Sequence, residues 1–441
     1  MIDSHKFFKG KRVIVMGLGL LGRGLADTIF LAQHGAIVTV TDLKTEQELA
    51  TSVKRLDGLE IHFELGGHDR VDFTAADMIL RNADVPRTSK YLRQAAENGV
   101  PIEMDESLFC KLFKGTIVGV TGTRGKTTTT MLIHRILATV RGGVHLAGNI
   151  KGCATLPLLD IVTNDDIVVL ELSSWQLQGF HDAKLSPNVS VFTNIYPDHL
   201  NRYKDMDDYI FDKKAIYLYQ RGMDFCVFNG DQPECAALCG EAPAGKDLFY
   251  LKDVPEHWGI KLPGRHNRSN IAGALTVCTK LGVDIEAVRE VTEQFLGVEH
   301  RLQTIAVKNG VKFIDDSTST TPVAGCAALE AMGNQRVFLI AGGADKKLDP
   351  APFVEAAASK AHRIALLNGD GTNAIHEGLV ELGAKHKIVG AFDNLKDAVL
   401  HLVAEAQAGD VVLLSPACAS FGMFQNEFHR GDCFVSIVNE L

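Results

Sequence analysis

Two strand–glycine–helix patterns constrain the fold of this chain more than any other feature. The first is VIVMGLGLLGRG at residues 13–24, and the second is TIVGVTGTRGKTTTT at residues 116–130. In each, an apolar run of strand length leads into glycines and then into a stretch that suits a helix. A strand that enters a helix through a glycine turn is typical of parallel α/β proteins that bind nucleotides. The chain is therefore predicted to be an α/β protein.

The first turn has the spacing of a dinucleotide-binding fingerprint. Its glycines are Gly17, Gly19 and Gly22, and Asp42 follows about twenty residues after the last of them. Glycines allow a tight turn and a close approach of the backbone to a diphosphate, and the helix N-terminus favours an anion. The pattern predicts a nucleotide or its diphosphate, of which NAD is only one option. A tight turn without a ligand is the alternative.

The second turn, GTRGKT at residues 122–127, is a shortened phosphate-binding loop. A strict Walker A motif has a glycine where Val120 stands. The backbone N–H groups can still wrap phosphates, while Lys126 neutralises the β- and γ-oxygens and Thr127 ligates Mg²⁺. The predicted nucleotide-binding residues of this turn are Gly122, Thr123, Arg124, Gly125, Lys126, Thr127 and Thr128.

Two further strand ends carry side chains that can bind a metal. Glu171 lies near the end of the apolar strand 166–172, and His199 follows the strand 189–195. Because sites in open α/β sheets form at the carboxyl ends of strands, both are expected beside the phosphate loop. A carboxylate there suits Mg²⁺, and a neutral imidazole can bind a metal or orient a substrate. Taken singly, each is an ordinary strand end, and Lys213 in its helical stretch is a solvated basic face.

The elements divide into three segments, each with alternating strands and helices, which predicts parallel sheets. The predicted strands of the first segment begin at residue 11 and continue at 36–43, 76–85 and 101–103. Those of the second are 116–120, 166–172, 189–195 and 224–230, and those of the third are 311–315, 336–343, 363–369 and 410–416. Since 441 residues exceed what one core usually carries, the predicted domains are 1–108, 109–298 and 299–441.

Composition argues against several functional classes. The net charge of −9 disfavours a nucleic-acid or anionic-membrane surface. No apolar stretch approaches the roughly 20 residues that span a bilayer, and the N-terminus lacks the apolar core of a signal peptide. The nine cysteines are scattered, and the nearest pair, Cys235 and Cys239, has no second pair to complete a zinc site. A cytoplasmic protein without membrane insertion or a nucleic-acid partner is expected.

The third segment adds polar residues after its first strand. Asp315, Asp316 and Ser317 follow the apolar run, where adjacent acids either cap a helix or contact a nucleotide sugar or a metal. Arg301, at the start of the segment, is placed to reach a phosphate. The nucleotide reading requires this segment to face the phosphate loop across an interdomain cleft.

Seven segments, taken in order, together resemble the Mur ligase family. They are TGTRGKTT, LELSSWQL, TNIYPDHLNRY, LPGRHNRSNIAGA, EHRLQ, DDSTSTTP and LLSPACASFGMF. Their order and spacing are similar over residues 11–434, which is nearly the whole chain. The resemblance implies a Rossmann-like N-terminal domain that binds a UDP substrate, a P-loop ATPase-like central domain and a Rossmann-like C-terminal domain.

The GLGLLGRG domain and the SPACASF segment are most similar to family members that add D-glutamate. The implied substrates are ATP, UDP-N-acetylmuramoyl-L-alanine and D-glutamate, and the implied cofactor is Mg²⁺. The muramoyl carboxylate would be phosphorylated, and the amine of D-glutamate would displace the phosphate, in peptidoglycan precursor synthesis. A carboxylate lacks a good leaving group until it is phosphorylated, which agrees with a phosphate loop at the centre of the chain. A monomer is expected.

The resemblance also implies roles for single residues. Catalytic roles fall on Lys126, Glu171, His199 and Lys213, of which Lys213 matches a lysine that is carbamylated in the family. Metal ligation falls on Thr127, Glu171, His199 and the carbamylated Lys213, and further ATP contacts fall on Asn267, Asn270, Arg301 and Asp316. The UDP part would contact Leu20, Leu21 and Asp42, the muramoyl part Asn149 and Ser173, and the incoming glutamate Thr320, Ser420 and Phe421.

Some positions depart from the family pattern. Thr318 and Glu427 stand where a lysine and an aromatic residue are common, and RNADVP at 81–86 replaces a Ser-Pro-Gly-type turn. The glutamate-binding lysine is open between Lys346 and Lys347. The alternatives are therefore a related ligase with another acceptor, such as L-glutamate, or a folate-polyglutamate enzyme, which the GLGLLGRG domain disfavours. Two other classes are an NAD-dependent oxidoreductase, which leaves the phosphate loop unexplained, and a nucleotide-gated binding module without chemistry.

Overall fold

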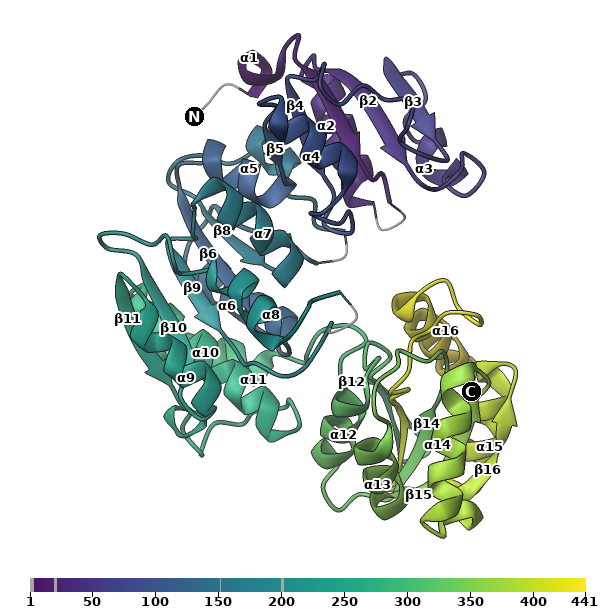
Figure 1. Cartoon of the computed structure of the whole chain (residues 1–441). Coiled ribbons are helices and arrows are strands. Elements are labelled where there is room, and N and C mark those ends of the chain that lie inside the picture. The colour runs from purple at the N-terminus through teal and green to yellow at the C-terminus, as the bar shows by residue number, and fades with distance from the viewer. Residues whose placement is uncertain (1–3, 20–21, 151, 200–201) are drawn as a thin grey trace. The chain divides into compact units, whose positions relative to one another are not determined.

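The computed structural model describes residues 4–19, 22–150, 152–199 and 202–441 (Figure 1). The chain forms two compact units, Met1–Glu256 with Ser269–Val291, and His257–Arg268 with Thr292–Leu441. The first unit contains two sheets and the second contains one. The predicted α/β class, with one sheet for each of the three segments, is confirmed.

The N-terminal sheet is parallel, with strand order β3-β2-β1-β4-β5. Its strands are β1 (Arg12–Met16), β2 (Ile37–Asp42), β3 (Ile61–Leu65), β4 (Met78–Arg81) and β5 (Ile102–Glu103). Its helices are α1 (Ser4–Phe8), α2 (Arg23–Gln33), α3 (Ala50–Lys54), α4 (Lys90–Glu97) and α5 (Asp105–Leu112). Val13 and Val15 share a core with α2, whereas Ile14 and Met16 share one with α4. This burial on both faces explains the continuous apolar run of β1.

The central sheet is also parallel, with strand order β11-β10-β9-β6-β8-β7. Its strands are β6 (Thr116–Thr121), β7 (Val144–Gly148), β8 (Ile167–Glu171), β9 (Val189–Phe192), β10 (Phe225–Asn229) and β11 (Gly245–Phe249). The helices of this part of the chain are α6 (Lys126–Val140), α7 (Ser174–Ala183), α8 (Met206–Lys214), α9 (Pro233–Leu238), α10 (Arg265–Lys280) and α11 (Ile285–Gln294). Short 3₁₀ turns lie at Leu156–Asp160, Cys239–Glu241 and Leu251–Asp253.

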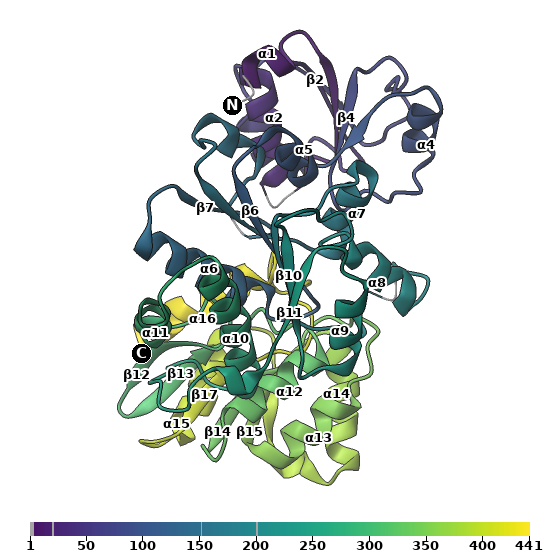
Figure 2. The same cartoon turned by 90° about the vertical axis from the view of Figure 1, so that its left-hand side faces the viewer.

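The C-terminal sheet has strand order β12-β13-β17-β14-β15-β16, and Figure 2 shows β12, β13, β17, β14 and β15 side by side. Its strands are β12 (Gln303–Lys308), β13 (Val311–Asp315), β14 (Val337–Ala341), β15 (Ala361–Leu367), β16 (Ile388–Phe392) and β17 (Val411–Leu414). Only the β12–β13 pairing is antiparallel among the described strand pairs. Its helices are α12 (Pro322–Ala331), α13 (Ala351–Lys360), α14 (Asp370–Glu381), α15 (Leu395–Glu405) and α16 (Glu427–Glu440), with a 3₁₀ turn at Ala384–Lys387.

Alternate side chains of β14 bury against different helices, as its apolar run requires. Leu339 and Ala341 share a core with α12, α13 and α14, whereas Phe338 and Ile340 share one with α15 and α16. A sheet covered on both faces leaves its carboxyl edge as the place where polar side chains gather.

The predicted domain boundaries at residues 108 and 298 stay predictions. Helix α5 runs across residue 108, and its Phe109 belongs to a hydrophobic core that the first two sheets share. At the second predicted boundary, Val298 and Arg301 form an isolated antiparallel β-bridge. Within the described parts of the chain, no helix has the length and apolar character needed to cross a bilayer.

Candidate active site

The phosphate loop lies between β6 and α6 and is shaped by glycines with positive φ. Gly122 has φ 143°, and Gly125, the N-cap of α6, has φ 78°. A Cβ on Gly122 would collide with Thr193 Oγ1, and a Cβ on Gly125 would collide with Asn270 Oδ1. The backbone therefore approaches its neighbours as only glycine allows, which agrees with the prediction of a glycine turn.

Asn194, two residues after β9, fixes the loop by two hydrogen bonds. Asn194 Oδ1 accepts from the Arg124 N–H at 2.8 Å, and Asn194 Nδ2 donates to the Arg124 carbonyl at 3.0 Å. Lys126 Nζ donates to the carbonyls of Gly122 and Thr123 at 3.2 and 3.1 Å. The ammonium group is therefore held against the loop, where a phosphate would meet it.

Glu171 ends β8, the neighbour of β6, and is 1% exposed. Asn149 Nδ2 donates to Glu171 Oε1 at 3.0 Å, whereas Glu171 Oε2 has no hydrogen-bond partner. A buried carboxylate oxygen without a partner is costly unless an ion or ligand completes it. Ser173, two residues further on, caps α7 by accepting from the Gln176 N–H at 3.3 Å.

The donor set near Glu171 fits magnesium rather than a metal held by protein alone. Among the described residues, no group of three His, Cys, Asp or Glu side chains could hold a metal ion. Magnesium is commonly held by one or two carboxylates, with substrate phosphates and water completing its shell. The unpartnered Oε2 of Glu171 beside a phosphate loop matches that mode of binding.

His199 follows β9 in a left-handed backbone conformation, with φ 56°. Its ring centroid lies 4.8 Å from that of Trp175, and its Nε2 lies 3.8 Å from Asp198 Oδ2. Asp198 also lies 3.5 Å from the Arg124 guanidinium. Burial alone would raise the pKa of Asp198, but the charges of Arg124 and His199 lower it overall. An anion therefore stands between the loop arginine and the imidazole.

Lys213 lies on α8 and is 1% exposed. Its Nζ donates to the Gly122 carbonyl at 2.9 Å and lies 4.8 Å from the ring centroid of Tyr209. Burial, and then the positive charge of Lys126, lowers the pKa of Lys213 well below its ordinary value. The alternative of a solvated basic face is therefore wrong for this lysine.

Sheet order explains how the four predicted catalytic residues come to one edge. Strand β6 pairs with β8 on one side and β9 on the other, in parallel. The phosphate loop with Lys126, Glu171 and His199 therefore leave the sheet at the same carboxyl edge, and α8 adds Lys213 there.

The first glycine turn is tied to the end of β2. Asp42 Oδ2 accepts from the Gly19 N–H at 3.1 Å, and its Oδ1 accepts from the Lys44 N–H at 2.9 Å. Asp42 thus orders the turn. The predicted contacts Leu20 and Leu21 lie outside the described residues.

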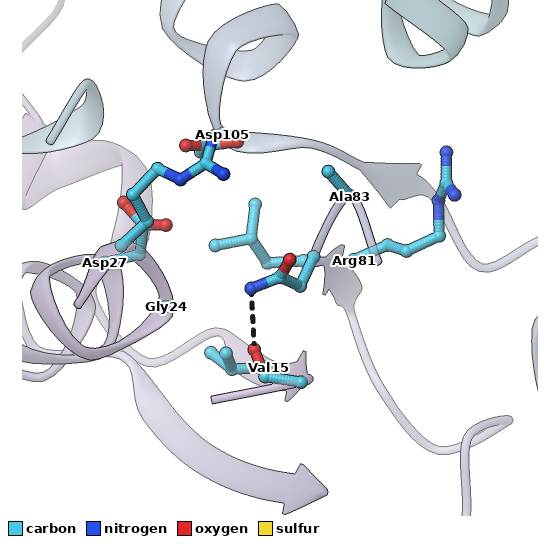
Figure 3. Close-up of a pocket in the computed structure, with 10 residues that line it drawn as sticks. Val15, Gly24, Asp27, Arg81, Ala83 and Asp105 are labelled. Carbon is cyan, nitrogen blue, oxygen red and sulfur yellow. Dashed lines mark hydrogen bonds between the residues drawn. The ribbon is translucent and has the colours of Figure 1, made fainter. Parts of the chain in front are cut away.

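A small cavity of about 10 Å³ lies beside this turn (Figure 3). Arg23, Asp27 and Asp105 are among its lining residues, and its volume suits about one water molecule. Asp27 is 4% exposed and its Oδ1 has no hydrogen-bond partner. Burial, and then the negative charge of Asp105, raises the pKa of Asp27 well above its ordinary value. The cavity is too small to hold a nucleotide.

In the second unit, Asp316 is fixed at the end of β13. It is 7% exposed and accepts from Ser415 Oγ at 2.9 Å and from the Leu302 N–H at 3.1 Å. Burial raises the pKa of Asp316 to about 7. Because Arg301 precedes Leu302, Arg301 and Asp316, which are both predicted to serve ATP, lie close together.

Asn267 and Asn270 lie near the start of α10, and each is 5% exposed. Asn270 packs against Gly125, since its amide occupies the space that a Cβ would need there. Asn267 Nδ2 donates to the Pro263 carbonyl at 2.8 Å and belongs to the second unit. Of this predicted pair, Asn270 is therefore the one joined to the phosphate loop within the first unit.

The predicted acceptor residues lie together in the C-terminal unit. Lys346 Nζ donates to Thr320 Oγ1 at 2.9 Å. The backbone bridge of Ala344 with Ala419 brings the lysine segment beside Ser420, whose buried Oγ has no hydrogen-bond partner. The next residue, Phe421, is 66% exposed. Of the two lysines that the sequence left open, Lys346 is thus the one in contact with a predicted acceptor residue.

Several residues that shape these sites were missed in the sequence. Asn194 holds the phosphate loop by its hydrogen bond to Arg124, and the ring of Tyr209 lies against the Lys213 ammonium. Arg430, 1% exposed on α16, donates to the Ser317 carbonyl at 2.8 Å and to the Cys418 carbonyl at 3.3 Å. Arg430 therefore joins the loop after β13 to the loop after β17. An arginine in a C-terminal helix carries no sequence signal for such a role.

Three family models match this chain in succession. They are the Mur ligase MurD-like N-terminal domain over residues 11–103, the Mur ligase middle domain over 120–246, and the Mur ligase glutamate ligase domain over 300–418. The UDP-N-acetylmuramoylalanine–D-glutamate ligase of Roseiflexus sp. (strain RS-1) is 39% identical, over 97% of this chain and 98% of that protein. The protein of the same name from Borreliella burgdorferi (strain B31) is 36% identical, over 98% of each.

Solved structures of similar fold cover almost the whole chain. UDP-N-acetylmuramate-alanine ligase MurC from Thermotoga maritima has a TM-score of 0.65 at 21% identity, over 98% of this chain and 99% of that one. MurF ligase from Thermotoga maritima, solved in complex with ADP, has a TM-score of 0.61 at 19% identity, over 100% and 99%. At these identities the structures show the fold alone. Family models and full-length relatives together show that the chain belongs to the Mur ligase family.

Proposed function

We propose that this Mur ligase joins D-glutamate to UDP-N-acetylmuramoyl-L-alanine and converts ATP to ADP and phosphate, in the synthesis of peptidoglycan precursors. The observation that carries the proposal is full-length identity of 39% and 36% to relatives named D-glutamate ligases. Mur ligases are ATP-dependent enzymes, and the ADP in the MurF structure agrees with an adenine nucleotide. The alternative acceptor L-glutamate is not favoured by these relatives.

The proposed reaction has two steps. A carboxylate oxygen of the muramoyl-alanine attacks the γ-phosphorus of ATP, the bond to the bridging oxygen breaks, and ADP leaves. The amine nitrogen of D-glutamate then attacks the acyl carbon, phosphate leaves with the electrons of the C–O bond, and the nitrogen loses a proton. Lys126, held against the loop, would stabilise the charge that moves between these oxygens.

The magnesium part of the proposal rests on the donor set. Thr127, Glu171 and His199 would hold the ion, with Glu171 using its unpartnered Oε2. When bound, Mg²⁺ would neutralise phosphate charge during transfer. Asp198 would keep the His199 imidazole beside the loop, because it lies near both His199 and Arg124.

A carbamylated Lys213 is the second part of the metal proposal. The amine nitrogen would add to the carbon of CO₂ and lose a proton, so that a carboxylate replaces the ammonium. Only a neutral amine can react in this way, and the buried position of Lys213 supports the neutral form. The resulting carboxylate would supply a hard oxygen ligand next to Glu171 and the phosphates.

The remaining predicted residues are proposed to bind the organic parts of the substrates. Leu20, Leu21 and Asp42 would border the UDP part, and Asn149 with Ser173 the muramoyl part. The rest of the ATP site would consist of Asn267, Asn270, Arg301 and Asp316, with Gly122, Thr123, Arg124, Gly125 and Thr128 around the phosphates. D-Glutamate would be held by Lys346, Thr320, Ser420 and Phe421. We place the enzyme in the cytoplasm, as a monomer, where ATP and UDP-linked sugars are available.

Phosphate release tests the proposed function directly. The protein is supplied with ATP, Mg²⁺ and UDP-N-acetylmuramoyl-L-alanine, together with D-glutamate, L-glutamate or no amino acid. Release that requires D-glutamate is the expected result, and the Lys126→Ala variant should release none. Equal phosphate release with L-glutamate would contradict the specificity for D-glutamate. Phosphate release that needs no muramoyl substrate would contradict the proposed reaction.

A further inference from the structure

A chain of side-chain contacts links the two glycine turns within the first unit. At one end, Asn82 Nδ2 donates to the carbonyl of Gly17 at 3.2 Å. At the other end, Lys213 Nζ donates to the carbonyl of Gly122 at 2.9 Å. Arg81, Gln178 and Asp212 lie between these ends and connect them.

Arg81, the last residue of β4, is the first link. It is 2% exposed, and its guanidinium donates to the Val85 carbonyl at 2.8 Å and to Gln178 Oε1 at 3.2 Å. Figure 3 shows this side chain extending away from Asp27 and Asp105, the acids of the small cavity. A guanidinium buried among neutral acceptors is costly to displace, because each lost contact leaves a charged group unpaired. Arg81 thus fixes the RNADVP turn to α7.

Gln178 on α7 is the second link, and its amide offers an acceptor to Arg81 and a donor to Asp212. Its Oε1 accepts from Arg81, and its Nε2 donates to Asp212 Oδ2 at 2.7 Å. An amide can join a cation to an anion in this way because it offers one acceptor and one donor group. Asp212 is 3% exposed and directly precedes Lys213 on α8.

A second contact strengthens the same connection. Arg87, directly after the RNADVP turn, donates to Asp182 Oδ1 at 2.6 Å and lies 3.9 Å from Asp212 Oδ1. The turn after β4 therefore contacts both α7 and the residue before Lys213. A shift of this turn would be transmitted to α8 through the buried or half-buried Arg81, Gln178 and Asp212, and also through the exposed Arg87.

We propose that Arg81 and Gln178 are positioning residues that couple occupancy of the first glycine turn to the placement of Lys213 at the phosphate loop. This rests on the proposed function, which assigns the UDP substrate to the first turn and ATP to the second. Gln178 touches neither turn, so its effect on both ligands passes through Arg81 and Asp212. Binding of one ligand then alters the affinity for the other by a shared factor.

The test compares the full-length protein with Gln178→Met, which keeps the length of the side chain and removes both hydrogen bonds. Gln94→Met makes the same chemical change at an exposed position on α4 and is the matched control. Calorimetry gives the Kd of UDP-N-acetylmuramoyl-L-alanine with and without a non-hydrolysable ATP analogue. We expect the analogue to change this Kd at least about fivefold in the wild type and in Gln94→Met. In Gln178→Met, the factor should fall to about one while each ligand still binds.

A second variant keeps the proposal testable if Gln178→Met folds poorly. Gln178→Glu still accepts from Arg81 but places a carboxylate against Asp212, so it should lose the coupling as well. An unchanged coupling factor in a folded Gln178 variant, or a factor of one in the wild type, would overturn the bridge. A wild-type protein that binds neither ligand would overturn the proposed function itself.

Discussion

Lys213 Nζ on α8 donates to the carbonyl oxygen of Gly122, in the loop after β6, at 2.9 Å. The lysine is buried, and its neighbour Lys126 donates to the same carbonyl. Two lysine side chains thus meet at one point of the phosphate loop. Like charges disfavour each other, so the charge of Lys126 adds to burial in lowering the pKa of Lys213.

Replacement of Lys213 by arginine distinguishes a requirement for a positive charge at this position from a requirement for a carbamate. Lys213→Arg keeps a positive charge but cannot form a stable carbamate, because the guanidinium stays protonated. If the carboxylate is required, kcat should fall about a hundredfold or more. Carbon-13 NMR after supply of labelled bicarbonate should show a carbamate signal in the wild type that the variant lacks. An active Lys213→Arg enzyme would contradict the carbamate.

Gly122→Ala should disable the phosphate loop. The new Cβ would collide with Thr193 Oγ1, and φ of 143° is unfavourable for any residue with a side chain. We expect ATP affinity to fall at least about tenfold, measured by titration with a fluorescent nucleotide. Gly142→Ala is the control, because no atom lies within 4 Å of its added Cβ. Equal affinities in the two variants would show that the loop does not hold the nucleotide.

The acceptor lysine can be identified by two parallel substitutions. The Lys346 ammonium donates to Thr320 Oγ1 at 2.9 Å, whereas the contact to Asp345 Oδ1 is made by the backbone N–H of Lys347. Lys346→Met should raise the KM for D-glutamate about tenfold or more, because a charged hydrogen bond to a carboxylate is lost. Lys347→Met should change it less than about threefold. The reverse order of the two effects would assign the role to Lys347.

Asp316 should give the protein a stability that falls between pH 4 and 7. Its pKa is raised to about 7 by burial, so the folded state keeps the proton while the unfolded state loses it. In this window the group lowers the free energy of unfolding by up to about 1.4 kcal/mol per pH unit. Below about pH 4 both states are protonated, and above about pH 7 both are ionised, so the effect is constant there.

The Asp316→Asn variant lacks this titration and serves as the reference. Urea unfolding of the ligand-free proteins at a series of pH values gives the difference in stability between wild type and variant. As the pH rises from 4 to 7, the free energy of unfolding of the wild type should fall relative to that of the variant. A difference that is independent of pH would mean that the carboxyl is ionised in the folded state.

The central strands were predictable from the sequence, whereas β5 was the one edge strand that pattern reading found among the described sheets. Every strand that pattern reading missed lies at an edge of its sheet, namely β3, β7, β11, β12 and β16. Central strands such as β8 and β14 are buried at every position, which makes a continuous apolar run. Edge strands such as β11 and β12 are largely half-buried or exposed, so their side chains carry little periodicity.

The site residues also divide into those that the sequence could predict and those that it could not. Lys126, Glu171 and His199 follow strands that are themselves readable, so their gathering at one sheet edge could be predicted. Arg81 and Gln178 could not be found in this way, because their roles depend on contacts between elements about a hundred residues apart. Lys213 was placed only in a helical stretch by the sequence, and it lies in the last turn of α8, Met206–Lys214.

The fit of Asn270 against Gly125 also bears on how the protein is made. The loop emerges from the ribosome long before α10 does, and at about 5–20 residues per second it waits on the order of ten seconds for that helix. Until then, the amide that packs on the glycine is missing, and the nascent loop lacks one wall. The loop therefore gains this wall only after the start of α10 has been synthesised.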